Sequence, residues 1–220
     1  MAEEKKKGWE SVSEEEKKRI MDFAEGYIEF INTSKTEREA AREIKRIADE
    51  AGFIDVEKAE SLNPGDKVYY INHGKSVYMA VIGKEVLTGG FNAVGAHIDC
   101  PRLDLKQEPL YEDNGLALLK THYYGGIKKY QWTTVPLALH GVVAFPDGST
   151  QEICIGEDEK DPVFLISDLL PHLAAKQNMK KMNEAIQGEK LNIIVGSIPD
   201  AEAEDNKVKK GILKILKEKY

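Results

Sequence analysis

The sequence predicts an α/β protein built from two parts that meet near Cys100. Three observations lead to this prediction. Two helical patterns, each with its own start signal, occupy the residues up to Gly52. Strand patterns with a hairpin signal follow them. From residue 100 onward, β-rich segments alternate with turn signals, so we expect a first domain over 1–99 and a second, β-rich domain over 100–220.

The composition is that of a globular protein with a substantial core. Of its 220 residues, 41% are hydrophobic, which allows one large domain or two small ones. The net charge of −7 argues against general nucleic-acid binding, because neutralising phosphates requires a basic face. Two cysteines without a C-x-x-C pair argue against a disulfide-rich secreted scaffold. The sequence also shows no signal-peptide or membrane-length apolar run, and we therefore expect a cytoplasmic protein.

Both predicted helices begin at a capping box. The first box starts at Ser13 and the second at Thr36, and each is completed by a glutamate three residues later. The second helix ends before Gly52, a residue type that favours helix ends. In the first helix, apolar residues at steps of three and four form one stripe: Ile20, Phe23, Tyr27 and Ile31.

After Gly52 the apolar period changes to that of strands. Residues 67–71 and 76–82 predict two strands joined by a hairpin at 72–75. Residues 91–99 are apolar enough to predict a strand buried in the middle of a sheet.

The second part is predicted to contain five strands and two helices. Turn signals at Pro109 and at two glycine-containing sites, 125–126 and 146–148, separate the first strands. The strands are expected over 102–107, 116–124, 136–145, 151–155 and 191–197. A helical stretch is expected over 167–177, and a basic amphipathic helix over 207–219 after an acidic loop.

The most distinctive chemical motif is His97-Ile98-Asp99, at the end of the strand predicted over 91–99. The strand period of two puts both polar side chains on one face. In a metal site, His97 would bind the ion through one ring nitrogen while the carboxylate holds the ring. Strand ends of α/β sheets are common places for such sites. On spacing alone, a structural His–Asp hydrogen bond is the more common use, so both interpretations stay open here.

The other candidate groups favour structural roles. Cys100 directly follows Asp99 and is interpreted as a packed or shielded thiol. No phosphate-binding loop, nucleophile elbow or dinucleotide-binding glycine turn is present. The remaining histidines are interpreted as solvated, sheet, capping or packing residues: His73, His122, His140 and His172.

Five motifs together resemble one known family. Residues 94–103, VGAHIDCPRL, resemble the G-A-H-T-D-S-P-x-L signature of the aspartyl aminopeptidase / aminopeptidase I family of metallopeptidases. Four further marks occur in family order and extend the resemblance over nearly the whole chain. They are a G-x-x-Y…N…A stretch at 65–80, Y-G-G at 124–126 with Trp132 after it, L-x-L-x-G-x-V at 137–143, and P-H-L-A at 171–174.

This resemblance implies the N-terminal portion of a zinc-dependent aminopeptidase, which removes N-terminal residues from peptides by two-metal-assisted hydrolysis. It implies a catalytic α/β domain, begun by residues 1–99, that is split by an inserted β-rich dimerisation and assembly domain over 100–220. Carried over by position, His97 is a zinc ligand and Asp99 is the carboxylate that orients its ring. Two Zn²⁺ ions per complete site are implied, with Co²⁺ or Mn²⁺ as chemically similar substitutes. Homo-oligomers, as dimers that build a dodecamer, are implied as well, without a nucleic-acid or membrane partner.

Departures from the family pattern leave alternatives open. Ile98 and Cys100 stand where the signature has Thr and Ser, and Lys176 replaces a His that reaches a neighbouring subunit's substrate in some relatives. One histidine cannot hold two zinc ions, so the remaining ligands and the general base are expected beyond Tyr220. The alternative is a non-catalytic assembly module or truncated pseudoenzyme of the same family. A third is an unrelated binding protein whose His-x-Asp is structural.

Overall fold

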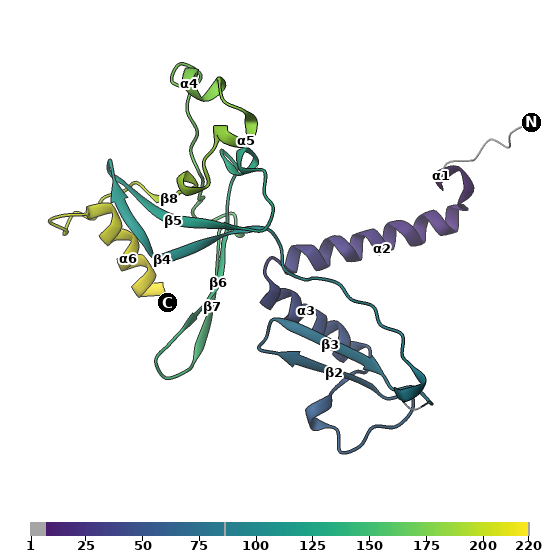
Figure 1. Cartoon of the computed structure of the whole chain (residues 1–220). Helices are drawn as coiled ribbons and strands as arrows, with labels where there is room; N and C mark the ends of the chain where they lie inside the picture. The colour runs from purple at the N-terminus through teal and green to yellow at the C-terminus, as the bar shows by residue number, and fades with distance from the viewer. Residues whose placement is uncertain (1–7, 86, 220) are drawn as a thin grey trace, which may run out of the picture. The chain divides into compact units, whose positions relative to one another are not determined.

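The computed structural model describes residues 8–85 and 87–219, and the chain divides into two units, Met1–Cys100 and Pro101–Tyr220 (Figure 1). Each unit has its own sheet, and helices and strands occur in both, as the predicted α/β class requires. Among the described residues, every helix is too short or too polar to cross a membrane.

The first unit begins with three helices, α1 (Gly8–Ser11), α2 (Glu14–Thr33) and α3 (Glu37–Glu50). Both predicted capping boxes are confirmed. The Ser13 hydroxyl accepts from the Glu16 N–H at 3.2 Å, and the Glu16 carboxylate accepts from the Ser13 N–H at 2.8 Å. The predicted stop is also confirmed, because Gly52 follows the end of α3 with a φ of +79°.

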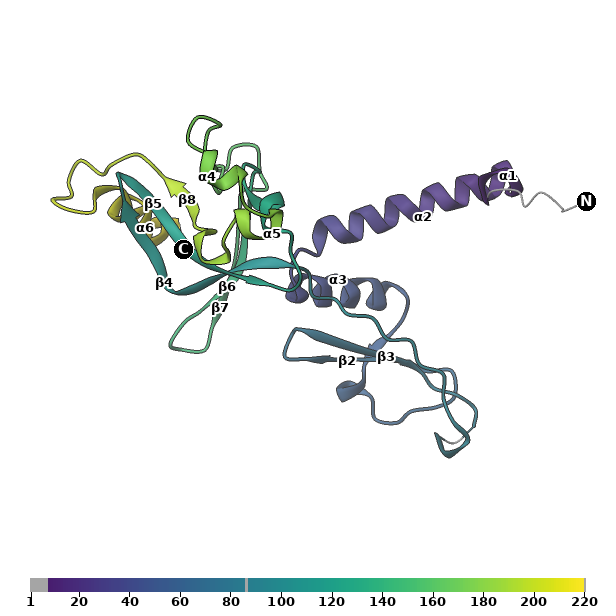
Figure 2. The ribbon, with the colours of Figure 1, turned by 45° about the horizontal axis from the view of Figure 1, so that its top comes forward.

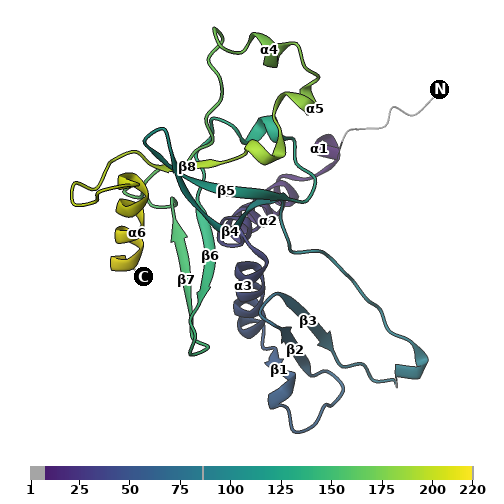
Figure 3. The same cartoon turned by 60° about the vertical axis from the view of Figure 1, so that its left-hand side comes forward.

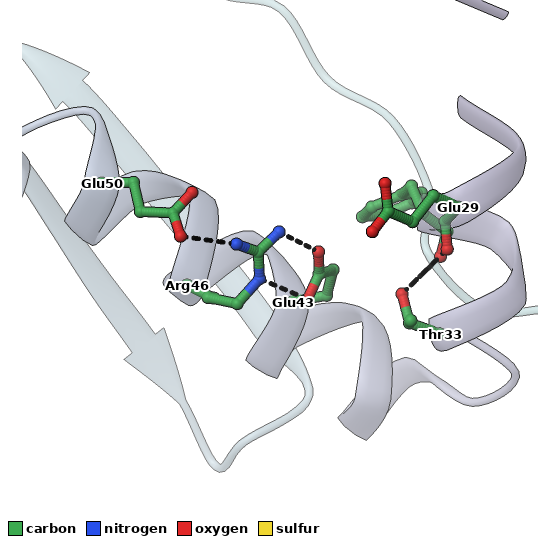
Figure 4. A network of polar contacts seen from close by, with 6 residues as sticks. Glu29, Thr33, Glu43, Arg46 and Glu50 are labelled. Atoms are coloured by element: carbon green, nitrogen blue, oxygen red, sulfur yellow. Dashed lines mark hydrogen bonds and ion pairs between the residues drawn. The ribbon is translucent and has the colours of Figure 1, made fainter. Parts of the chain in front are cut away.

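Polar contacts stabilise the ends and the exposed face of these helices (Figure 4). The Thr33 hydroxyl donates to the Glu29 carbonyl at 3.1 Å in the last turn of α2. On α3, the Arg46 guanidinium donates to Glu43 on one side and to Glu50 on the other, each at 2.6 Å. Both pairs are spaced three or four residues apart, where side chains on a helix are neighbours.

Helix α3 packs against a small sheet whose strand order is β1-β2-β3. The strands are β1 (Ile54–Asp55), β2 (Lys67–Asn72) and β3 (Ser76–Val81), and the short helix η1 (Val56–Lys58) links the first two. The buried residues of this layer are Ala40, Ala41 and Ala48 of α3 together with Val68 and Tyr69 of β2. The predicted hairpin is confirmed, and its turn places His73 and Gly74 at positive φ.

Two predictions for the first unit differ from the structure. The apolar stripe of α2 is present, but α2 has no buried residue, and Phe23 is 80% exposed. The strand predicted over 91–99 is wrong. After the short helix η2 (Leu87–Gly89) the chain is extended, but no described strand pairs with it, and Phe91 and Val94 are exposed. A strand is defined by hydrogen bonds to a neighbour, so apolar sequence alone does not make one.

The second unit contains an antiparallel sheet of order β4-β5-β8 and a separate two-stranded hairpin of β6 and β7. Figure 2 shows this hairpin projecting from the rest of the unit. The strands are β4 (Arg102–Asp113), β5 (Leu116–Tyr124), β6 (Leu139–Ala144), β7 (Thr150–Ile155) and β8 (Ile193–Gly196). The short helices are η3 (Lys129–Trp132), α4 (Ala175–Asn178), α5 (Met182–Ala185) and η4 (Gly188–Lys190).

The core of the second unit lies where the sheet, the hairpin and the chain around Phe164 meet. Its buried members are Ile155, Phe164, Ile166, Leu191 and Ile193. The last helix, α6 (Lys207–Lys219), contacts β4, β5 and β8 (Figure 3). The helix approaches β8 closely, because a Cβ on Gly196 would lie 2.7 Å from the Ile212 side chain. A side chain at position 196 would therefore displace the Ile212 side chain.

Predictions for the second unit hold best where the local signal is strong. The bounds predicted for β5 and α6 agree with the structure, and β6, β7 and β8 lie within two or three residues of their predicted places. The turn predicted at Pro109 is wrong, since Pro109 lies within β4, where the ladder shifts register after Leu105. The helix predicted over 167–177 is wrong for most of its length. Only Ala175–Asn178 is helical, because Pro171 interrupts the stretch.

Candidate metal site

His97 and Asp99 lie beside each other in the extended stretch that ends the first unit. The His97 Nδ1 atom is 3.0 Å from the Asp99 carbonyl oxygen and 3.2 Å from its Oδ1 atom. Extended backbone places side chains two residues apart on one side, so this contact forms without a neighbouring strand. The predicted pairing of the two residues is therefore present in the structure.

The partners of Nδ1 determine which nitrogen of His97 is available to a ligand. A carbonyl and a carboxylate both accept hydrogen bonds, so Nδ1 carries the proton in the neutral ring. The lone pair is then on Nε2, the atom that a metal ion would bind. The side chain of His97 is 83% exposed, whereas that of Asp99 is 40% exposed. The imidazole is thus oriented by its neighbour and accessible to solvent.

The described part of the chain supplies one metal ligand rather than a complete site. Within residues 8–85 and 87–219, no group of three or more His, Cys, Asp or Glu side chains could hold a metal ion. Zinc takes about four ligands, so His97 can only contribute to a site that other residues complete. Its chemistry fits that contribution, because a neutral imidazole with its proton held by a carboxylate is a common zinc ligand.

The structure brings together two motifs that are distant in the sequence. Arg102 lies 4.2 Å from the ring centroid of Tyr124, and its Nε–H donates to Asp104 at 2.7 Å. Gly125, with a φ of +77°, packs against Pro101. The family-like motifs at 94–103 and 124–126 therefore contact each other where β4 begins and β5 ends. The sequence gives no local signal for this contact, because it depends on the pairing of two strands.

A shallow hollow of about 410 Å³ lies elsewhere in the second unit, between Tyr130 and the segment 168–186. Its charged lining residues are Asp168 and Lys180, and Asp168 accepts from the Gln177 side chain at 2.9 Å. This lining offers no pair of nucleophile and base, so the hollow is a weaker candidate for chemistry than His97 and Asp99.

Comparison with known proteins agrees with the motifs. The family model described as aminopeptidase I zinc metalloprotease (M18) matches residues 30–220. A probable M18 family aminopeptidase 1 of Clostridium acetobutylicum is 50% identical, over 100% of this chain and 48% of the relative. The crystal structure of an M18 family aminopeptidase from Thermotoga maritima superposes with a TM-score of 0.90 and 46% identity, covering 99% of this chain and 47% of that one.

A more distant structure shares the fold. It is the mApe1 dodecamer of S. cerevisiae, with a TM-score of 0.61 and 19% identity over 91% of this chain and 44% of the other. The chain spans about half the length of the curated relatives it matches. From the family match over residues 30–220 and the high identity to M18 relatives, the chain belongs to the M18 family of aminopeptidase I zinc metalloproteases.

Proposed function

We propose that this chain is the N-terminal portion of a zinc-dependent aminopeptidase that removes N-terminal residues from peptides. In this proposal His97 contributes one zinc ligand through Nε2, and Asp99 orients the ring through Nδ1. The observation that supports it most directly is the 3.2 Å contact between His97 Nδ1 and Asp99 Oδ1 within the family signature. The other ligands and the general base would come from protein beyond the residues of this chain.

The exposure of His97 favours a ligand role over a purely structural hydrogen bond. An exposed His–Asp pair contributes little to folding stability, because water competes for both partners. Among the residues that the structure describes, the ring is 83% exposed, so none of their apolar side chains gives it a packing role. An oriented and accessible Nε2 atom is what a metal site requires.

Zinc supports the proposed reaction by polarising the scissile carbonyl and by activating a bound water for attack. The family description names zinc, and the proposal extends this to two Zn²⁺ ions per complete site. Similar nitrogen and oxygen ligands also accept Co²⁺ or Mn²⁺. Within this chain, His97 would hold the ion and Asp99 would keep the proton on Nδ1, which makes Nε2 more basic.

We also propose that residues 1–99 begin the catalytic α/β domain and that residues 100–220 form an inserted assembly domain. The division of the structure at Cys100 and the β-rich character of the second unit support this assignment. Assembly as dimers that build a dodecamer is part of the proposal, and one protein of the same fold is a dodecamer. We place the enzyme in the cytoplasm, acting on peptides and without a nucleic-acid partner.

The proposal is tested by measuring zinc in the complete protein. We expect His97→Ala to lower the zinc content measured by elemental analysis, and Asp99→Asn to weaken zinc affinity by about 10- to 100-fold. His73→Asn is the matched control, because His73 is an exposed histidine in the β2–β3 turn, and Asn tolerates its positive φ. Unchanged zinc content in His97→Ala would remove His97 from the site.

Activity measurements separate the proposal from the alternative of a non-catalytic module. We expect the complete protein to hydrolyse aminoacyl reporter substrates and to lose this activity with a chelator. The 220-residue chain alone should hydrolyse none, because it contributes one ligand. Zinc-dependent turnover by the 220-residue chain would contradict the assignment of the other ligands. A complete protein that binds zinc without turnover would favour the non-catalytic alternative.

A further inference from the structure

The β6–β7 hairpin places a histidine directly opposite a cysteine. His140 of β6 and Cys154 of β7 are partners in the antiparallel ladder. The Phe145 N–H donates to the Ser149 carbonyl at 2.9 Å beside the turn, and hydrogen-bonded pairs then alternate with non-hydrogen-bonded ones. His140 and Cys154 lie five positions along the ladder from the hydrogen-bonded pair Phe145 and Ser149. Because the two kinds of pair alternate, an odd number of steps makes His140 and Cys154 a non-hydrogen-bonded pair. In such pairs the Cβ atoms are about 4.5–5.5 Å apart and the side chains share one face.

A carboxylate orients the histidine of this pair. The Nε2 atom of His140 lies 3.0 Å from Glu157 Oε1, in the loop that follows β7. Because an ionised carboxylate only accepts, Nε2 carries the proton of the neutral ring, and Nδ1 carries the lone pair. The His140 side chain is 12% exposed, whereas Cys154 is exposed. The ladder thus places a potential nucleophile, Cys154, opposite a potential base, His140, which Glu157 orients.

We propose that Cys154 is a reactive thiol, activated by His140 and Glu157, and a modification site for low-molecular-weight disulfides and soft electrophiles. The thiol proton passes to His140 Nδ1, and Glu157 stabilises the resulting imidazolium. The thiolate attacks one sulfur of the disulfide reagent, whose S–S bond breaks as the mixed disulfide with Cys154 forms. The second half of the reagent leaves as a thiolate. Cys154 is thereby oxidised and the reagent disulfide is reduced.

Other charges near the pair are mostly acidic and oppose a thiolate. Glu152 lies two residues before Cys154 in β7 and shares its face, since strand side chains alternate. The loop after β7 adds Asp158, Glu159, Lys160 and Asp161 beside Glu157, and the Asp161 carboxylate accepts from the Gly156 N–H at 2.8 Å. Activation by His140 must outweigh this repulsion, so removing the histidine is the decisive change.

The test measures how fast Cys154 forms a mixed disulfide in the 220-residue chain. The probe is bis(2-hydroxyethyl) disulfide, a neutral reagent that the acidic residues do not repel, and the product is followed by mass spectrometry. Cys100→Ser leaves Cys154 as the single thiol and serves as the parent. We expect His140→Gln to slow the reaction at pH 7 about tenfold, because less thiolate is then present. Glu157→Gln should slow it by a smaller factor, because the ring remains.

Two further comparisons distinguish activation from a change of structure. Glu159→Gln is the matched control, since it removes a carboxylate from the same loop, and we expect a rate at or slightly above the parental one because a charge that opposes the thiolate is lost. At pH 10 an unassisted thiol is ionised as well, so the rates of all variants should converge. Parental rates for both His140→Gln and Glu157→Gln at pH 7 would overturn the proposal. Equal slowing of His140→Gln at pH 7 and pH 10 would also overturn it, because it would indicate altered access.

Discussion

Thr36 and Glu39 stabilise the first turn of α3 through reciprocal hydrogen bonds. The Glu39 N–H donates to the Thr36 hydroxyl at 3.3 Å, and the Thr36 N–H donates to the Glu39 carboxylate at 2.8 Å. These bonds satisfy the backbone N–H groups of Thr36 and Glu39, which have no hydrogen-bond partner within the helix itself. Because α3 is the helix that packs on the first sheet, its start affects the stability of the first unit.

We therefore expect Thr36→Ala to destabilise the first unit by about 1 kcal/mol. The measurement is urea denaturation of the 220-residue chain, in which hydrogen exchange of the α3 amides reports the unfolding of the first unit. Thr36→Ser is the control, because its hydroxyl can make the same bonds. A Thr36→Ala variant as stable as Thr36→Ser would show that the cap contributes nothing measurable.

The sequence predicts single residues well where the signal is local. The capping boxes at Ser13 and Thr36 and the contact of His97 with Asp99 each depend on residues two or three positions apart. Arg102 and Tyr124, by contrast, meet only after β4 and β5 have paired. His140 was expected to be a satisfied sheet residue, and its bond to Glu157 agrees with that expectation. That His140 lies opposite Cys154 can be known only from the register of the β6–β7 hairpin, and the sequence pattern does not specify this register.

At the scale of elements, α3 depends on charge pairs along its exposed face. The hydrogen bond from Arg46 lowers the pKa of Glu43, and the hydrogen bond from Lys45 lowers that of Asp49. A carboxylate with a lowered pKa in the folded state stabilises that state above its unfolded pKa. This contribution is lost as the pH falls through the folded-state value. The charge pairs of α3 should therefore act at neutral pH and disappear in acid.

Arg46→Gln tests this dependence. We expect a small decrease in the thermal midpoint at pH 7, because each such helix pair is a weak, salt-sensitive interaction. At a pH well below the lowered folded-state pKa of Glu43, where the carboxylates are protonated, the variant and the unchanged chain should melt alike. Circular dichroism at both pH values gives the comparison. Arg19→Gln, which changes an exposed arginine of α2, controls for the loss of one positive charge. A decrease that persists in acid would contradict the role of the carboxylates.

Helices and strands were predicted correctly where the apolar periodicity of the segment and the turns that flank it define its two ends. The bounds of β5 and α6 agree with the sequence patterns, since tight turns and a clear apolar face mark them. The segment over 91–99 failed for the opposite reason. Its apolar residues indicate a buried strand, but the described chain contains no strand that pairs with it. Long-range pairing decides whether such a segment becomes a strand, and periodicity does not report it.

At the scale of the whole molecule, the two units have separate sets of buried residues. In the first unit, small alanines of α3 cover Val68 and Tyr69 of β2. In the second, Leu191 is fully buried and belongs to the cluster with Ile155, Phe164, Ile166 and Ile193. The Thr121 hydroxyl also donates to the Leu191 carbonyl and ties this position to β5. Separate cores predict that each unit unfolds as a cooperative unit of its own.

Leu191→Ala tests this prediction at the centre of the second core. Removing a fully buried leucine side chain costs about 2–5 kcal/mol, through lost burial and the cavity that remains. We expect faster hydrogen exchange throughout β5 and β8, measured by mass spectrometry under native conditions, while exchange in α3 and β2 stays unchanged. Val142→Ala is the control, because Val142 is an exposed residue of β6 and its truncation leaves no cavity. Equal acceleration in α3 and β2 would show instead that the two units share one cooperative transition.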